Sequence, residues 1–225
     1  MATDTLFSKS RSARTVRGQL SRPQLLRLAI GFTIVQLLAA WSMDEISQSA
    51  DLRRAFHWGW LVAAETAAAL VLGAAAGVGI AVLIRRSPPF GTIAERVVPL
   101  ADWESFRPLD YVTIAVCAGL GEEVLFRGAI QPVVGVVIQA VLFGLVHWTC
   151  RAHVGIAVTA GLAFGLVVQL SGSLWPGIAA HFAVDLTTGL ALGEALRRGW
   201  IDHAGRFAAP TPASTSTSVS ASPAM

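Results

Sequence analysis

Long apolar runs separated by short polar connections constrain the fold of this chain more than any other feature of its sequence. Of its 225 residues, 54% are hydrophobic and 14% are charged, whereas soluble domains carry about 25% charged residues. An apolar helix of about 20 residues spans the hydrocarbon core of a bilayer. The sequence predicts an all-α, polytopic transmembrane helical bundle of about six spans, at 25–41, 58–84, 109–131, 133–149, 154–170 and 174–196.

Polar segments flank this bundle at both ends. Residues 1–24 are basic and read as a disordered cytoplasmic tail, and residues 25–196 form the transmembrane helical domain. Residues 197–225 read as a disordered C-terminal tail, because their last part is a low-complexity run of Ala, Ser, Thr and Pro. Within the second span, Gly73, Gly77 and Gly79 would let another helix approach closely.

The distribution of basic residues predicts the orientation of the bundle. Of the 17 basic residues, Arg53 and Arg54 fall on one side of the membrane and Arg127 falls inside a span, whereas all others fall on the side of the two termini. Cytoplasmic loops are the basic ones, so both termini are expected in the cytoplasm. The Ala-, Arg- and Gly-rich composition favours a bacterial inner membrane. No interleaved basic patch is present, so nucleic acid is excluded as a partner.

The third span carries charges that hydrocarbon does not tolerate. Glu122, Glu123 and Arg127 lie inside it, and a charged side chain at a span centre costs roughly 2.5–3.5 kcal/mol on insertion scales. Glu123 and Arg127 are four residues apart, so they share a helical face and can pair. Glu122 points about 100° away from that pair. The pair does not account for Glu122, so a carboxylate at position 122 inside the span indicates a functional site.

Further ionisable residues occur on two neighbouring spans. His147 ends the fourth span, and His181 and Asp185 lie four residues apart on the sixth, where they share a face. A single histidine in an apolar helix is usually a packing residue. Three spans that each carry ionisable groups instead predict one polar cavity inside the bundle.

Two chemistries suit a carboxylate and two histidines in a dry pocket. Glu122 can act as a general base on a water molecule while the histidines stabilise an oxyanion. Alternatively, Glu122, His147 and His181 are three ligands of a Zn²⁺ ion with an open fourth position. Either chemistry hydrolyses a peptide bond. The spacing does not separate them, because the sequence has no His-Glu-x-x-His helix.

These motifs resemble those of the CAAX prenyl protease and bacteriocin-processing (CPBP) family of intramembrane endopeptidases, which is related to the type II CAAX prenyl endopeptidase. The matching residues are Glu122-Glu123-x-x-x-Arg127, Phe143-x-x-x-His147 and His181-x-x-x-Asp185, in the order of the family. The resemblance covers about residues 109–196. It implies an endopeptidase that cuts a membrane-associated peptide or the C-terminal segment of a protein.

The resemblance also implies roles for individual residues. Glu122 corresponds to the glutamate that activates water, and His147 to its partner or to a metal ligand. His181 and Asp185 correspond to the oxyanion-side pair, and Glu123 and Arg127 to a supporting pair. The family often has Asn where this chain has Asp185. Because an aspartate donates a hydrogen bond only when protonated, an oxyanion role for Asp185 requires either a carboxyl group that stays protonated or an indirect role in which it orients His181.

Two other functions fit the same residues. One is a non-catalytic membrane protein of the same fold, such as an immunity factor or a scaffold. The other is an ion-coupled transporter, because ionisable residues in spans also mark ion pathways. The family has been interpreted both as metalloproteases and as metal-free glutamate proteases, so the sequence leaves Zn²⁺ and a metal-free mechanism equally open.

Overall fold

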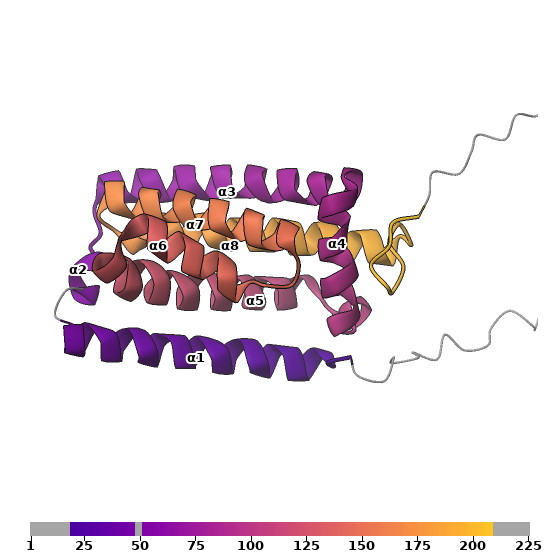
Figure 1. Cartoon of the computed structure of the whole chain (residues 1–225), viewed down its shortest axis with the longest axis horizontal. Coiled ribbons are helices and arrows are strands. Elements are labelled where there is room, and N and C mark those ends of the chain that lie inside the picture. Colours follow the sequence, from indigo (N-terminus) through magenta and orange to yellow (C-terminus); the bar gives the residue numbers. More distant parts are fainter. Residues whose placement is uncertain (1–18, 48–50, 209–225) are drawn as a thin grey trace, which may run out of the picture.

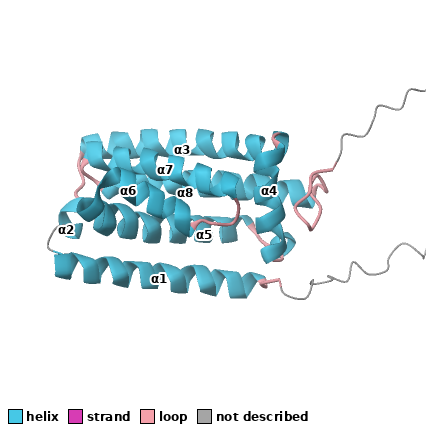
Figure 2. Cartoon of the chain, in the orientation of Figure 1, coloured by secondary structure: helices cyan, strands magenta, loops and turns pink. Residues whose placement is uncertain are grey.

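The computed structural model describes residues 19–47 and 51–208, and this part of the chain is built from helices and loops, as Figure 2 shows. Most of the two expected tails, residues 1–18 and 209–225, lies outside the described residues. The elements are α1 (Arg22–Ser47), α2 (Leu52–Ala55), α3 (Trp60–Arg86), α4 (Pro88–Val97), the 3₁₀ helices η1 (Val98–Leu100) and η2 (Trp103–Ser105), α5 (Pro108–Glu123), the π-helix η3 (Val124–Ile130), α6 (Gln131–Val146), α7 (Arg151–Ser171) and α8 (Leu174–Arg197).

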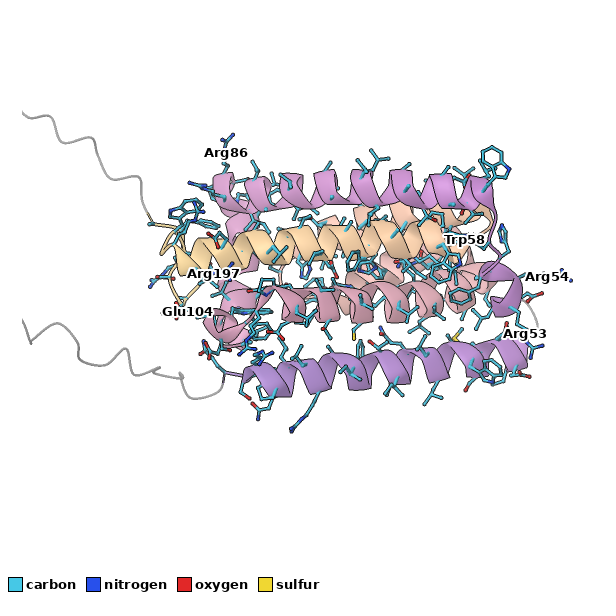
Figure 3. All side chains as sticks on the ribbon, turned by 180° about the vertical axis from the view of Figure 1, so that it is seen from behind. Arg53, Arg54, Trp58, Arg86, Glu104 and Arg197 are labelled. Carbon is cyan, nitrogen blue, oxygen red and sulfur yellow. The ribbon has the colours of Figure 1, made fainter. Side chains whose placement is uncertain are left out.

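The long helices run along one common axis, and α4 crosses one end of the bundle (Figure 1). Helix α8 packs against α3, α5 and α7, α6 packs against α7, and α1 covers the outside of α5. Figure 3 shows Arg86, Glu104 and Arg197 at one end of the bundle and Arg53, Arg54 and Trp58 at the other. The charged side chains therefore gather at the two ends, where a bilayer would meet water.

The structure supports an integral membrane protein. Within the described residues, four helical runs are long and apolar enough to cross a membrane: Arg22–Ser47, Trp60–Arg86, Pro108–Val146 and Arg151–Ser171. The run Pro108–Val146 covers the third predicted span and most of the fourth. Helix α8 is not among the four, because His181 and Asp185 lower its mean hydropathy. The all-α polytopic bundle is thus confirmed, and the number of six spans stays a prediction.

The surface of α1 is apolar, and its buried face is small and polar. Leu28, Phe32 and Leu38 are about 60% exposed, whereas Thr33 and Gln36 are buried. This arrangement is the reverse of a soluble protein, in which large apolar side chains fill the core. It fits a helix whose outer face contacts lipid and whose inner face packs by close approach and hydrogen bonds.

A kink separates the third and fourth predicted spans. Helix α5 continues through η3 into α6, and Gly135 interrupts α6 with φ 80° and ψ 163°. A positive φ of this kind suits glycine because it has no Cβ. The kink turns the chain back into the bundle, and α6 then ends at Val146.

Glycines bring α3 and α8 together. A Cβ at Gly73 would meet the backbone carbonyl oxygen of Ala180, and one at Gly77 would meet the Thr187 hydroxyl. The close approach predicted for these two glycines is confirmed. The predicted close approach is wrong for Gly79, which faces open space. Gly79 lies on the side of α3 that does not contact α8.

Residues just outside the predicted helical domain contact the bundle at both of its ends. Leu20 forms a β-bridge with Ala101, and α1 begins three residues before the expected start at residue 25. Beyond α8, Ile201 pairs with Phe207 and is buried in a cluster that contains Ile93. Residues 198–208 therefore fold back onto the bundle, since two apolar side chains in this segment have a core to pack against.

Candidate active site

The acidic motif lies where α5 passes into η3. Glu122 and Glu123 are the last two residues of α5, and Arg127 lies in the π-helix, a geometry that often marks functional sites. Nη1 of Arg127 lies 2.9 Å from Oε1 of Glu123, and both side chains are fully buried. The predicted pair is confirmed, and each buried charge has the opposite charge that makes its burial tolerable.

Two phenylalanines enclose this ion pair. The Arg127 guanidinium carbon lies 4.3 Å from the ring centroid of Phe143 and 5.6 Å from that of Phe164. Nη2 of Arg127 also donates a hydrogen bond to the carbonyl oxygen of Gly161, at 3.4 Å. Phe143 contacts both the ion pair and the His147 ring, whose centroid lies 4.5 Å away.

His147 follows the last residue of α6 as its C-cap. Its Nδ1 lies 2.7 Å from the carbonyl oxygen of Phe143. A carbonyl oxygen only accepts hydrogen bonds, so Nδ1 carries the proton. The other ring nitrogen, Nε2, then faces Oε2 of Glu122 at 3.5 Å.

His181 on α8 lies between three carboxylates. Its Nδ1 donates to Oε1 of Glu123 at 2.8 Å. Its Nε2 lies 3.5 Å from Oδ2 of Asp185 and 3.8 Å from Oε2 of Glu122. The Phe164 ring stacks on the imidazole at a centroid distance of 5.3 Å. His181 is therefore held on both nitrogens and on one face.

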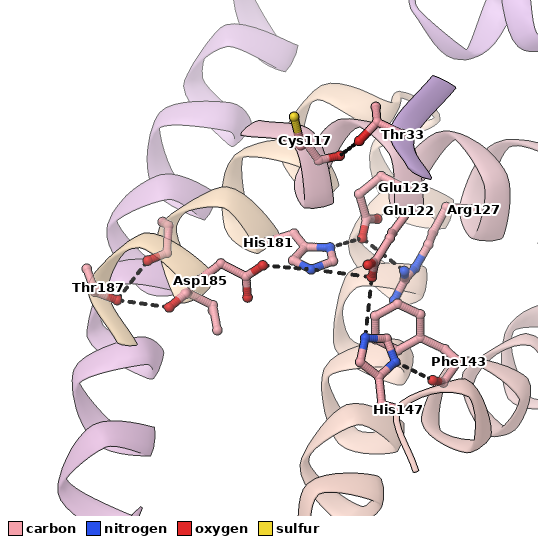
Figure 4. A network of polar contacts seen from close by, with 12 residues as sticks. Thr33, Cys117, Glu122, Glu123, Arg127, Phe143, His147, His181, Asp185 and Thr187 are labelled. Carbon is pink, nitrogen blue, oxygen red and sulfur yellow. Dashed lines mark hydrogen bonds and ion pairs between the residues drawn. The ribbon is translucent and has the colours of Figure 1, made fainter. Parts of the chain in front are cut away.

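The six predicted site residues meet in one cluster, drawn in Figure 4: Glu122, Glu123, Arg127, His147, His181 and Asp185. A straight helix would separate positions 122 and 147 by about 37 Å. The kink at Gly135 brings them into contact instead. The cluster can accept, donate and hold protons in a site that the bundle shields from bulk solvent.

A Zn²⁺ ion in this cluster would need three donor atoms that converge on one point. The Nδ1 atoms of both histidines are held by oxygen atoms, as is usual for histidines that bind a metal. However, no group of three His, Cys, Asp or Glu side chains within the described residues is arranged to hold a metal ion. The ligand set Glu122, His147 and His181 stays a prediction.

Sequence reasoning missed His153. Its Nδ1 lies 2.8 Å from Oγ1 of Thr149, and its ring centroid lies 5.6 Å from that of His147. His153 and Asp185 both line an apolar cavity of about 290 Å³ among α3, α4, α5, α7 and α8. The sequence feature that could have identified His153 is its position only one short turn after His147.

Sequence reasoning also missed two buried glutamines of α6. Gln139 is fully buried and Gln131 is 9% exposed. Gln139, Phe143 and His147 follow one another at intervals of four residues, so they share one face of α6. This spacing places Gln139 on the same face as the candidate catalytic histidine and was the signal that could have found it.

The comparisons with known proteins give one result. A family model described as Rce1-like, type II CAAX prenyl endopeptidase Rce1-like, matches residues 104–187. This range includes all six residues of the cluster. No curated protein and no solved structure matches the chain.

Proposed function

Residues 104–187 form a domain of the Rce1-like type II CAAX prenyl endopeptidase family, and from this membership we propose that the chain is an intramembrane endopeptidase. Its substrate is a membrane-associated peptide or the C-terminal segment of a protein. Glu122, His147, His181 and Asp185 form the catalytic set. Glu123 and Arg127 support it from the buried side.

One observation carries this proposal. Oε2 of Glu122 lies within 4 Å of the Nε2 atoms of His147 and His181, which come from two other helices. Burying an ionised carboxylate inside a helical bundle is costly unless it is paired. Packing alone does not require a second carboxylate beside Glu123, which is already paired with Arg127. A reaction that transfers protons does require one, and Glu122 is that second carboxylate.

Glu122 and His147 are suited to activate water. With its proton on Nδ1, His147 presents a lone pair on Nε2, and the Glu122 carboxylate presents an oxygen 3.5 Å away. A water molecule beside them would donate one hydrogen to each acceptor and direct an oxygen lone pair at the substrate. As that oxygen bonds to the carbonyl carbon, Glu122 takes the proton as general base.

His181 is suited to stabilise the oxyanion that then forms. Its Nδ1–H is already used by Glu123, so Nε2 donates a hydrogen bond only when His181 is cationic. Glu122, Glu123 and Asp185 surround it with negative charge, which favours that cation. Before substrate binds, Asp185 accepts this hydrogen bond from Nε2 and orients the ring, and the oxyanion then replaces Asp185 as the acceptor.

The second half of the reaction returns the proton. The tetrahedral intermediate collapses, the C–N bond breaks, and the proton held by Glu122 passes to the leaving amine. One water is consumed, one carboxylic acid, which keeps the second proton of that water, and one amine are formed, and the four side chains end in their starting states. The same group therefore serves first as base and then as acid.

The test is cleavage of a peptide library by detergent-purified protein. Glu122→Gln should lose activity by roughly 10²–10⁴-fold, and His147→Ala and His181→Ala should also be inactive while remaining folded. The matched control is Glu65→Gln, because Glu65 is a glutamate of α3 outside the cluster. Retained activity in Glu122→Gln would overturn the proposal.

A chelator and a metal assay separate the two mechanisms. Activity that a chelator leaves intact supports the metal-free mechanism. Activity that a chelator abolishes, together with near-stoichiometric zinc, replaces it with the metal-ligand role of Glu122, His147 and His181. A phenotype that survives loss of all three residues would indicate the immunity or scaffold function. Ion flux in proteoliposomes would indicate the transporter.

A further inference from the structure

A second polar cluster lies behind the candidate site, between α6, η3 and α7. Nε of Arg127, Oε1 of Gln131 and both amide atoms of Gln139 are buried, and none of them has a hydrogen-bond partner within the described part of the chain. Buried polar groups of folded proteins nearly always have a partner. Four unpartnered atoms on three neighbouring side chains therefore point to a bound ligand.

The three side chains face the same stretch of α7. Arg127 donates to the carbonyl oxygen of Gly161, and Gln131 donates to that of Gly165 at 3.0 Å. A Cβ at Gly165 would lie 2.6 Å from Oε1 of Gln131 and 3.2 Å from Oε1 of Gln139. Glycine at this position thus leaves room for the two amides to converge.

This cluster opens toward the end of the bundle where α2 lies. Arg127 and Gln131 line a cavity of about 430 Å³, and the exposed residues Asp51 and Arg54 lie at its rim. The cavity is on the side opposite the His153 cavity, which lies among α3, α4, α5, α7 and α8. Solvent can reach the cavity wall formed by Arg127 and Gln131 from this end, whereas Gln139 is fully buried deeper in the bundle.

The cluster also connects to the candidate site. Arg127 pairs with Glu123, and Glu123 holds His181. Oε2 of Glu123 has no hydrogen-bond partner among the described residues. A Cβ at Gly177 would lie 2.9 Å from this oxygen and 2.6 Å from Val168, and Val168 lines the cavity.

We propose that Arg127, Gln131 and Gln139 bind a chain of ordered water molecules that supplies the hydrolytic site from the end of the bundle near α2. The unpartnered atoms are two donors, on Arg127 and Gln139, and two acceptors, on Gln131 and Gln139. Water matches this mixture because it both donates and accepts. A cation would need acceptors alone, and an anion would need donors alone.

The route matters because each peptide bond cleaved consumes one water molecule in a site shielded by the bundle. A substrate that covers Glu122 and Asp185 from the side of the His153 cavity would block water from that side. The supply role rests on the proposed peptidase function. The binding of water by the glutamines does not, so the two can be tested separately.

Hydroxyl-radical footprinting of the purified full chain tests the bound water. Radicals formed from bound water oxidise adjacent side chains even when these are buried. Phe143 and Phe164 stack on Arg127, so they should be oxidised well above Phe106, which is equally buried at 4% exposure but packs against Trp103 and Tyr111. Labelling of Phe143 and Phe164 no higher than that of Phe106 would overturn the proposal.

Gln139→Leu tests the supply role. This variant should lose most of the labelling at Phe143 and should lower kcat roughly tenfold with KM unchanged, because only the water step is affected. Gln169→Leu is the matched control, since Gln169 is an exposed glutamine that lines the cavity. This variant should keep the wild-type labelling at Phe143 and the wild-type kcat.

Loss of labelling with an unchanged kcat in Gln139→Leu would overturn the supply role. Gln139→Met provides a second apolar variant if the first fails to fold. If the wild type cleaves nothing, the peptidase proposal fails while the footprint still decides whether water is bound.

Discussion

At the scale of single residues, the buried pair of Glu123 and Arg127 determines how the site is held. Each side chain is fully buried, and removing one partner of such a pair costs about 3–5 kcal/mol. Arg127→Met should therefore lower the melting temperature in detergent by a large amount. It should also abolish activity, because Glu123 would no longer hold His181 in place.

The double variant Glu123→Gln/Arg127→Met separates pairing from packing. If the single variants are destabilised by an uncompensated charge, removing both charges should recover much of the stability. Losses that simply add up in the double variant would show that the two side chains contribute independently. Activity should stay low in either case, because the neutral amide that replaces the Glu123 carboxylate accepts a weaker hydrogen bond from His181 and no longer stabilises its cationic form.

The residues that the sequence identified were those whose charge conflicts with an apolar run. Glu122, His147 and His181 stand out for this reason. Gln139 is neutral and lies in the most apolar of the long helices, so no charge marked it. His153 falls in the short connection between the predicted spans 133–149 and 154–170, and its distance from His147 depends on how that connection folds.

At the scale of the helices, the contact between α3 and α8 sets the position of His181 and Asp185. Gly73→Ala should destabilise the fold by about 1–3 kcal/mol, the usual effect of overpacking, because its Cβ would meet backbone atoms of Ala180. Since Ala180 precedes His181, activity should fall as well. Gly79→Ala should be nearly neutral, and equal effects of the two variants in activity and thermal-unfolding assays would contradict this account.

The turn after α8 is predicted to be sensitive to acid. Backbone and side-chain hydrogen bonds from Arg206, with one from the Ala204 amide, lower the pKa of Asp202. A lowered pKa stabilises the folded turn above the ordinary value of about 3.9, and this contribution is lost as the pH falls through the lowered pKa. Proteolysis near Arg206 should therefore increase below about pH 4, and Asp202→Asn should show the increase already at neutral pH.

The helices were largely predictable, but the geometry of their interruptions was not. Runs of apolar residues gave the position of each long helix to within a few residues, except that α1 extends to Ser47, six residues beyond its predicted end. A break between the spans 109–131 and 133–149 was predicted close to the kink at Gly135, but neither the positive φ of Gly135 nor the π-helix of η3 has a local signal, because glycines such as Gly31 also occur inside straight helices. These two features place Arg127 and His147 in the site, so the geometry of the site had to come from the structure.

At the scale of the whole molecule, the start of α1 and the end of α8 lie at the same end of the bundle (Figure 1). Glu104 lies at this end and Trp58 at the other. The basic residues gather beside Glu104, so the positive-inside rule predicts that this end faces the cytoplasm. Trp58 is 61% exposed and suits the opposite membrane interface, where tryptophan is enriched.

Single cysteines at these two positions test the orientation. Cys117 and Cys150 are both free thiols, so they are first replaced by alanine. A membrane-impermeant maleimide added to spheroplasts should then label Trp58→Cys at once and should label Glu104→Cys only after lysis. The reverse pattern would place the basic end outside. It would also reverse the side from which water enters through the cavity beside Arg127 and Gln131, while leaving the geometry of the catalytic cluster unchanged.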